Sequence, residues 1–170
     1  EILGKQHFGN VLDLGCGDGS IGLSLLHIAD KLKLVDISPN MIEKSKENTP
    51  ENLTGKQVSY LVYDGTKYRS DELFDLIICL GVIAHVDSMS SLFDTLSANL
   101  KPGGKLLFQF TEKNSVHGWI LYKFFGKWFG VYEVNRTTAS VIIPEMKKRG
   151  CEVLDNKIYS EATFGLSKFG

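Results

Sequence analysis

Short apolar runs alternate along the chain with longer segments in which apolar residues recur at helical spacing. Nearly continuous apolar runs are typical of strands that are buried on both faces of a parallel sheet, and the helical segments supply the crossovers between such strands. We therefore expect an α/β fold of the Rossmann-like, doubly wound kind, with a mainly parallel sheet and helices on both faces.

The same pattern predicts the places of the individual elements. Strands are expected over residues 10–14, 33–36, 58–63, 74–79, 105–110 and 152–159. Helices are expected over residues 20–29, 39–48, 90–100 and 138–149. Ser38 and Pro39 supply an N-cap and a first-turn proline for the second helix. Lys101-Pro-Gly-Gly104 is a strong stop and turn signal after the third helix.

Size and composition predict one soluble domain over residues 1–170 with a core that needs no cross-links. The 19 Lys and Arg residues nearly balance the 20 Asp and Glu residues, which leaves a formal charge of −1. A chain with so little net charge is not expected to bind nucleic acid.

Three scattered cysteines favour neither a disulfide framework nor a zinc site, so we expect a reducing, cytoplasmic location and no bound metal. The first residues lack the basic and apolar start of a signal peptide. The most apolar stretch, residues 116–131, is interrupted by His117, Lys123 and Lys127 and is too short to span a bilayer.

The loop Gly15-Cys-Gly-Asp-Gly19 lies between the first strand and the first helix, where a nucleotide-binding loop is expected. Asp36 ends the next strand, 21 residues after Gly15, and a carboxylate there can accept hydrogen bonds from both hydroxyls of a ribose. A plain strand-to-helix turn is the other interpretation of glycines alone. Together, the glycines and Asp36 favour a ligand that contains adenosine.

Two residues bear on which adenosine ligand this is. A dinucleotide fingerprint has glycine at its sixth place, and this chain has Ser20 there. Asp13 precedes the loop, and its carboxylate would repel a pyrophosphate but attract an ammonium or sulfonium group. A cationic adenosine ligand is therefore favoured over NAD.

With these features the chain resembles the class I S-adenosylmethionine-dependent methyltransferases. Similar motifs recur in the family's order over about residues 8 to 159, and the likeness is greatest to the small-molecule group that includes quinone-biosynthesis enzymes. The motifs are Val11-Leu-Asp-Leu-Gly-Cys-Gly-Asp-Gly19, Leu34-Val-Asp-Ile-Ser-Pro-Asn-Met41, Tyr63-Asp-Gly65, Phe74-Asp-Leu-Ile-Ile-Cys-Leu-Gly-Val-Ile-Ala-His-Val86 and Leu100-Lys-Pro-Gly-Gly-Lys-Leu-Leu107.

The resemblance implies S-adenosylmethionine as the cofactor and S-adenosylhomocysteine as its product. It places Asp13, Gly15 and Gly17, with Cys16 between the two glycines, along the methionine part of the cofactor. Asp36 would hold the ribose.

The adenine would be bordered by residues from two further loops. Ile37 and Met41 would flank the ring, and Asp64 would accept a hydrogen bond from its exocyclic amine, with the backbone of Gly65 close by. Two alternatives stay open, because Met41 also fits a core residue of its helix and Asp64 also fits a turn former before Gly65.

Leu80, Gly81 and His85 follow the fourth strand and would border the channel of the methyl donor. A structural histidine is an equally good interpretation of His85. No general base is assigned, because methyl transfer depends mainly on alignment and needs a base only where the acceptor loses a proton.

The acceptor is expected to be a small molecule. Enzymes that methylate adenine or amide nitrogens have an Asn/Asp-Pro-Pro-Tyr-type segment after the fourth strand, where this chain has Leu80-Gly-Val-Ile83. The chain has no Pro-Cys nucleophile for cytosine either. Residues 115–132 carry seven aromatic residues, a composition that fits a lid covering an apolar or aromatic acceptor. A helix packed on the sheet or on a partner chain, or a helix on a membrane surface, would explain them as well.

Two features depart from the family's pattern. Family members carry helices ahead of the first strand, and this chain starts just before that strand. Residues 160–170 are a poor candidate for the family's seventh strand. We therefore expect a methyltransferase core that lacks part of its substrate cover, and a non-catalytic S-adenosylmethionine-binding domain stays open beside the enzyme. An NAD-dependent oxidoreductase is a weaker alternative, and the oligomeric state is left open.

Overall fold

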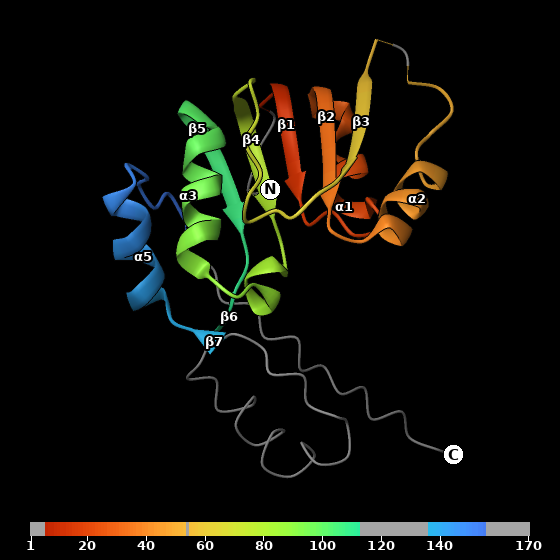
Figure 1. Cartoon of the computed structure of the whole chain (residues 1–170). Coiled ribbons are helices and arrows are strands. Elements are labelled where there is room, and N and C mark those ends of the chain that lie inside the picture. Colours follow the sequence, from red (N-terminus) through yellow and green to blue (C-terminus); the bar gives the residue numbers. More distant parts are fainter. Residues whose placement is uncertain (1–5, 54, 113–135, 156–170) are drawn as a thin grey trace, which may run out of the picture.

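Five parallel strands form the central sheet of the computed structural model, which describes residues 6–53, 55–112 and 136–155. The strands lie in the order β3-β2-β1-β4-β5 (Figure 1). Their bounds are β1 (Phe8–Leu14), β2 (Ala29–Asp36), β3 (Gln57–Val62), β4 (Phe74–Cys79) and β5 (Leu100–Phe108). The strand order reverses between β1 and β4, which confirms the predicted doubly wound fold.

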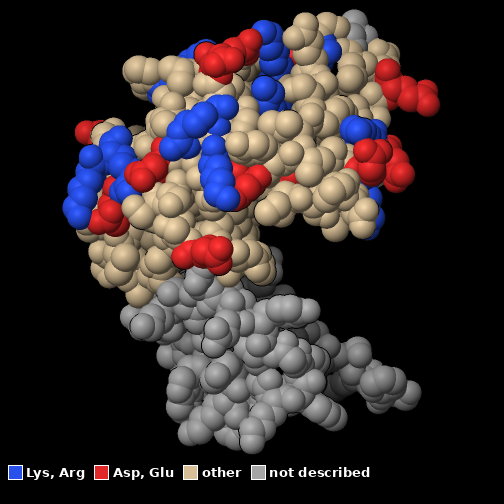
Figure 2. All heavy atoms as spheres, viewed as in Figure 1, with Lys and Arg blue, Asp and Glu red and all other residues tan. Residues whose placement is uncertain are grey.

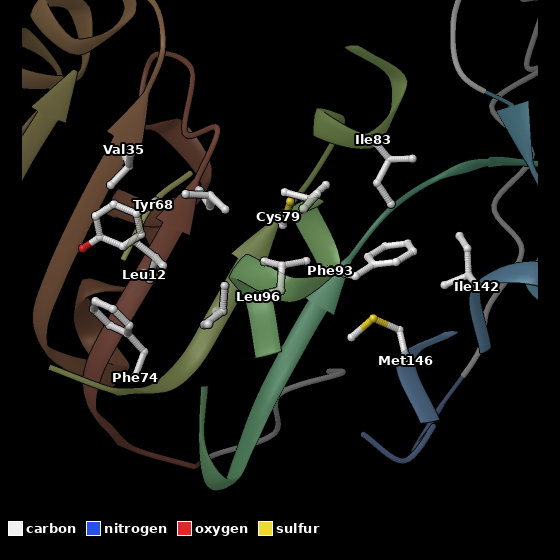
Figure 3. Close-up of a cluster of buried hydrophobic side chains, with 13 residues drawn as sticks. Leu12, Val35, Tyr68, Phe74, Cys79, Ile83, Phe93, Leu96, Ile142 and Met146 are labelled. Atoms are coloured by element: carbon white, nitrogen blue, oxygen red, sulfur yellow. The ribbon is translucent and has the colours of Figure 1, made fainter. Parts of the chain in front are cut away.

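Helices cover both faces of this sheet. One face carries α1 (Ser20–Ser24) and α2 (Pro39–Glu47), and the other carries α3 (Met89–Asn99) and α5 (Ala139–Lys148). Alternate residues of β4 belong to different cores: Leu76 and Ile78 lie in the core of the first face, and Ile77 and Cys79 in that of the second. Figure 3 shows the second core, with Cys79 among its side chains. Burial on both faces explains why this strand has a continuous apolar run.

The start of α2 forms as its sequence predicts. Ser38 is the N-cap, and its hydroxyl accepts a hydrogen bond from the backbone N–H of Met41 at 3.4 Å. Pro39 occupies the first helical turn, where a missing N–H leaves no helical hydrogen bond unmade. The helix therefore begins immediately after β2 and stays close to the carboxyl end of that strand.

The first helix is shorter than predicted, and β2 begins earlier. The helix expected over residues 20–29 is an α-helix only over Ser20–Ser24, followed by a 3₁₀ turn, η1 (Leu26–Ile28). β2 then starts at Ala29 instead of residue 33. Lys31 and Lys33 alternate in this strand with the buried Leu32 and Leu34, so the lysines and the leucines lie on opposite faces of the sheet. Lysines in the first half of the strand concealed it from a search for apolar runs.

Two other strands also differ from their predicted bounds. β5 begins at Leu100, and residues 101–104, predicted as a turn, form an irregularity between the pairs Phe74–Leu100 and Leu76–Lys105. The strand predicted over 152–159 is wrong in its described part, because residues 151–155 form no strand. Val153 and Leu154 are exposed there and pair with no described neighbour. Residues 156–159 lie outside the described residues.

A short parallel pair extends beyond β5. It joins β6 (Thr111–Glu112) to β7 (Arg136–Thr137), so the chain returns to the same place before α5 begins. The predicted lid, residues 115–132, falls between these strands and lies outside the described residues. No helix within the described ranges is long and apolar enough to cross a membrane.

The charges on the face shown in Figure 2 are mixed. Lys and Arg side chains alternate there with Asp and Glu side chains, and no single sign prevails. This distribution agrees with the small net charge of the sequence and offers no basic tract for a nucleic acid on that face.

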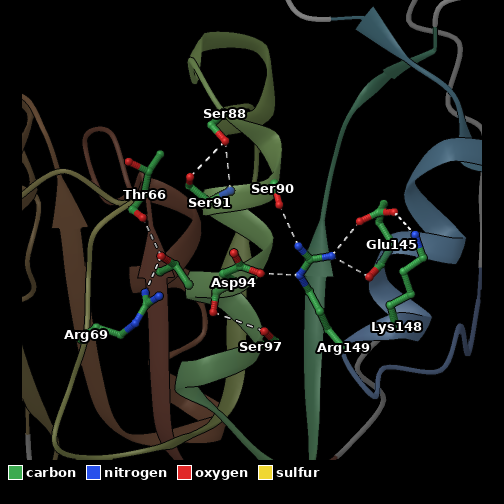
Figure 4. Close-up of polar contacts among 11 residues, drawn as sticks. Thr66, Arg69, Ser88, Ser90, Ser91, Asp94, Ser97, Glu145, Lys148 and Arg149 are labelled. Carbon is green, nitrogen blue, oxygen red and sulfur yellow. Dashed lines mark hydrogen bonds and ion pairs between the residues drawn. The ribbon is translucent and has the colours of Figure 1, made fainter.

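Arg149, just beyond α5, joins that helix to α3 (Figure 4). Its guanidinium donates to Asp94 at 2.7 Å, to the carboxylate of Glu145 at 2.9 Å and to the Ser90 hydroxyl at 2.9 Å. It also lies 5.8 Å from the centre of the Phe93 ring. Only 15% of the side chain is exposed, so these contacts are partly shielded from water.

We expect Arg149→Ala to lower the free energy of unfolding by about 1–3 kcal/mol, because it removes the hydrogen bonds that join α5 to α3 and the packing of the largely buried side chain over Phe93. The matched control is Lys148→Ala, which removes a side chain that is 69% exposed and should change stability by less than about 0.5 kcal/mol. Urea unfolding of both variants measures the difference. Equal effects would show that Arg149 does not hold the two helices together.

Candidate functional site

The loop after β1 is held against β2 by its backbone. The N–H groups of Gly15 and Cys16 both donate to the carbonyl oxygen of Val35, at 2.7 and 3.1 Å. Gly15 has a positive φ of 76°, and a Cβ atom at this position would lie 2.1 Å from Cγ2 of Val82. Glycine is therefore required here both by the backbone conformation and by the close approach of the segment after β4.

Asp36 ends β2 beside this loop. One oxygen of its carboxylate accepts from the N–H of Gly17 and the other from the N–H of Ser38, both at 2.9 Å. Each carboxylate oxygen can accept a further hydrogen bond, so the group is fixed in position and still able to bind hydroxyl groups.

These residues border a cavity of about 550 Å³ at the carboxyl ends of β1 to β4. This edge is where an open α/β sheet binds ligands. Of the residues predicted for the site, the cavity is lined by Gly15, Asp36, Ile37, Asp64, Gly65, Leu80, Gly81 and His85. Ile37 is 70% exposed and presents an apolar side chain beside the Asp36 carboxylate.

Four predicted site residues lie outside the lining. Asp13, at 3% exposure, is buried behind the glycine loop, and the side chain of Cys16 within that loop is buried too. Gly17 and Met41 do not border the cavity either. Burial raises the pKa of the Cys16 thiol to about 12, and the charge of Asp13 adds to the effect. This thiol is therefore unsuited to act as a nucleophile at neutral pH.

Asp13 lies behind the glycine loop and accepts a hydrogen bond from the N–H of Gly22 at 3.1 Å. Burial raises the pKa of its carboxyl to about 7; the Gly22 amide opposes this shift and the charge of Asp36 adds to it. A cation close to a buried carboxyl of this kind stabilises the charged form of that carboxyl.

The raised pKa of Asp13 predicts a pH dependence of stability. In the unfolded chain an aspartate has a pKa of about 3.9. The folded state therefore binds the proton more tightly, and the free energy of unfolding falls as pH rises from about 4 through about 7. Asp13→Asn should remove this dependence and raise stability at pH 8 by about 2–4 kcal/mol.

Urea unfolding at pH 5 and pH 8 measures this effect. Asp18→Asn is the matched control, because Asp18 lies on the same loop but is exposed. An unchanged difference between the two pH values in Asp13→Asn would show that Asp13 does not titrate in this range.

Asp64 forms a turn at the end of β3 and also lines the cavity. It accepts from the hydroxyl and the N–H of Thr66, at 2.7 and 2.9 Å, and pairs with Lys67 at 3.1 Å. The Thr66 donors, more than Lys67, lower the pKa of this carboxyl. The turn-forming interpretation is thus observed, and it leaves the carboxylate at the rim.

The structure adds lining residues that sequence reasoning did not select: Tyr63, Thr66, Val82, Val86 and Asp87. Tyr63 directly follows β3, and the others lie within two residues of a predicted site residue in the sequence. Val82 belongs to a 3₁₀ turn, η2 (Val82–His85), which brings the segment after β4 over the loop after β1. In the sequence, only the predicted strand ends indicated that these residues lie near the site. The turn after β4 has no distinct sequence pattern.

The donor set of the cavity favours an organic ligand. Within the described part of the chain, no group of three His, Cys, Asp or Glu side chains could hold a metal ion. The cavity instead combines carboxylates that accept hydroxyl or amine donors with apolar side chains that can flank a ring.

Comparison with known proteins identifies the family. Residues 2–155 match the family described as "Methyltransferase domain". The ubiquinone biosynthesis O-methyltransferase of Rickettsia felis is 31% identical over 121 residues, which are 69% of this chain and 49% of that protein. A malonyl-[acyl-carrier protein] O-methyltransferase of Ilyobacter polytropus is 33% identical over 110 residues, 62% of this chain and 40% of that protein.

Solved structures show the same fold. The magnesium protoporphyrin IX methyltransferase of Synechocystis PCC 6803, with bound S-adenosylhomocysteine, has a TM-score of 0.69 at 21% identity and covers 86% of this chain and 65% of its own. This chain spans about half the length of the curated relatives that it matches. It belongs to the methyltransferase domain family, within the class I S-adenosylmethionine-dependent superfamily that its motifs resemble.

Proposed function

We propose that the cavity binds S-adenosylmethionine and that the protein transfers its methyl group to a small-molecule acceptor. The observation that carries this proposal is the Asp36 carboxylate, fixed by two backbone N–H groups beside the glycine loop at the edge of a 550 Å³ cavity. Bound S-adenosylmethionine supplies a methyl group that its positively charged sulfur already activates.

The lining fits this cofactor in size and in chemistry. A Cβ atom at Gly17 or Gly81 would meet no atom within 4 Å, so the loops after β1 and β4 leave room for a ligand to approach their backbone. Asp36 would accept the two ribose hydroxyls, and Ile37 would flank the adenine. Asp64, held by Thr66, would accept the adenine amine.

The methionine end would lie along the loop after β1. Gly15 and Gly17 would border it with backbone alone, while the carboxyl of Asp13 is buried behind the loop, where the approach of a cation favours its negative charge. This charge favours the ammonium and sulfonium groups and opposes a pyrophosphate, which supports S-adenosylmethionine over NAD. Cys16 would act only through its backbone, and the predicted place of Met41 beside the adenine stays a prediction, because Met41 does not line the cavity.

Catalysis would rest on alignment. Leu80, Gly81 and His85 would hold the acceptor in line with the methyl group, and positioning of this kind is worth an effective molarity of roughly 10⁵ M or more. Where the acceptor carries a hydroxyl, His85 and Asp87 are the lining residues on the segment after β4 that could take its proton.

An apolar or aromatic acceptor fits the remaining lining. Val82 and Val86 add aliphatic side chains near His85, and Tyr63 adds a ring at the end of β3. The relatives named above act in ubiquinone biosynthesis or on malonyl-[acyl-carrier protein], and the names give O-methylation as the reaction. We infer a hydroxyl or carboxyl group on an otherwise apolar molecule.

Transfer of a tritium-labelled methyl group from S-adenosylmethionine tests the proposal. The acceptors should include phenols with an apolar chain, carboxylic acids and amines, and Asp36→Ala should serve as the inactive control. We expect labelling of a phenol or carboxylic acid that Asp36→Ala abolishes. Tight cofactor binding without transfer to any acceptor would instead favour the non-catalytic binding domain.

A further inference from the structure

β3 forms one end of the sheet, and no described strand pairs with its outer edge (Figure 1). Proteins usually protect such an edge with charged residues, a proline or a bulge. Gln57–Val62 contains no charge and no proline, and its six residues pair with β2 in unbroken register. Leu61, Val62 and the following Tyr63 are 37%, 45% and 45% exposed.

The hydrogen bonds to β2 determine which groups of β3 point outward. The N–H of Tyr63 donates to the carbonyl oxygen of Asp36, so Tyr63 faces β2. Because backbone groups alternate along a strand, Leu61 and Ser59 face β2 as well. The N–H and C=O groups of Val58, Tyr60 and Val62 therefore face the open edge, and no described residue bonds to them.

This edge is complementary to a second copy of itself. If two β3 strands run antiparallel about a two-fold axis at Tyr60, each Val58 lies opposite Val62 of the other copy. All three outward residues then form hydrogen-bonded pairs, with six backbone hydrogen bonds in total. The same register places Lys56 of each copy opposite Asp64 of the other, which adds two pairs of opposite charge.

We propose that the protein forms a two-fold dimer through antiparallel pairing of β3 with β3, which joins the two sheets into one. Apolar side chains of residues 58–62 cover each other across the axis, and the charged pairs at its ends fix the register. Asp64 already accepts from Thr66 and pairs with Lys67, and Lys56 pairs with Asp30, so the two contacts between the copies are attractions between opposite charges and not additional hydrogen bonds. Each copy thus brings Lys56 to the rim of the other copy's cavity.

Sedimentation of the full chain tests this proposal. The concentrations should run from about 1 to 200 µM, a range that covers the dissociation constants of typical dimers. We expect a dimer, and we expect Val62→Lys to weaken it at least about tenfold because a charge is then placed at the paired edge. Val141→Lys is the matched control, because Val141 is 51% exposed on α5 and far from this edge in the fold (Figure 1). A monomeric parent, or a dimer that Val62→Lys leaves intact, would overturn the proposal.

A cysteine on the axis tests the register separately. Opposed residues of a hydrogen-bonded pair have Cα atoms about 5.5 Å apart, within the range of a disulfide. Tyr60→Cys should therefore link two copies covalently under mild oxidation, whereas Ser59→Cys, which lies opposite Leu61, should not. Equal cross-linking of both variants would contradict this register. Neither experiment depends on methyl transfer, so their failure would leave the proposed function unaffected.

Discussion

Asp36→Ala is expected to lower the affinity for S-adenosylhomocysteine by about two to four orders of magnitude. The change removes two hydrogen bonds from ribose hydroxyls to a carboxylate, each worth about 1.5–3 kcal/mol. It also removes the acceptor of the Gly17 and Ser38 N–H groups, which shape the loop on one side and the start of α2 on the other. The affinity should therefore fall further than the ribose contacts alone would predict.

Calorimetric titration measures the affinity, and thermal unfolding reports whether the variant folds. Asp18→Ala is the matched control, because it removes an exposed carboxylate from the neighbouring glycine loop, where that carboxylate accepts a hydrogen bond from the N–H of Ser20. We expect the control to bind as the parent does. A folded Asp36→Ala variant with the parent's affinity would show that Asp36 does not hold the ribose.

Gly15→Ala is expected to damage both folding and binding. The new methyl group would lie 2.1 Å from Cγ2 of Val82, and the positive φ of 76° adds strain of about 1–2 kcal/mol for alanine. Relief of the contact requires the loop after β1 and the segment after β4 to move apart, and both line the cavity. We expect the affinity for S-adenosylhomocysteine to fall roughly 30- to 1,000-fold, or by about 2–4 kcal/mol.

Two variants separate the causes of this loss. Gly150→Ala has the same kind of strain, with a φ of 80°, but a Cβ there would meet nothing within 4 Å, so it should lower stability and leave binding unchanged. Adding Val82→Ala to Gly15→Ala should restore part of the affinity, because it removes the atom that is struck. No recovery in the double variant would mean that the contact is not the cause.

The sequence patterns predicted the sheet well where strands are buried on both faces. β4 was predicted at its observed bounds because every residue that it places in either core is apolar. β2 was predicted four residues short, because its first half is covered on one face only and alternates lysine with leucine. The strand predicted at 152–159 rested on apolar residues of which two, Val153 and Leu154, are exposed.

Strand ends also indicated most of the site, because parallel strands bring their carboxyl ends to one edge. They did not tell which atoms face the cavity. Asp13 is the last residue but one of β1, yet its side chain lies beneath the loop and accepts from the N–H of Gly22. Val82 and Val86 were overlooked because a 3₁₀ turn, which leaves no periodic signal in so few residues, folds them over the cavity.

Calorimetric titration of the parent chain with S-adenosylmethionine, S-adenosylhomocysteine and NAD tests the central claim most directly. We expect both adenosyl compounds to bind at a single site per chain and NAD to give no comparable response, because the Asp13 carboxylate favours a cation and opposes a pyrophosphate. Tight binding of NAD, with no response to either adenosyl compound, would contradict it.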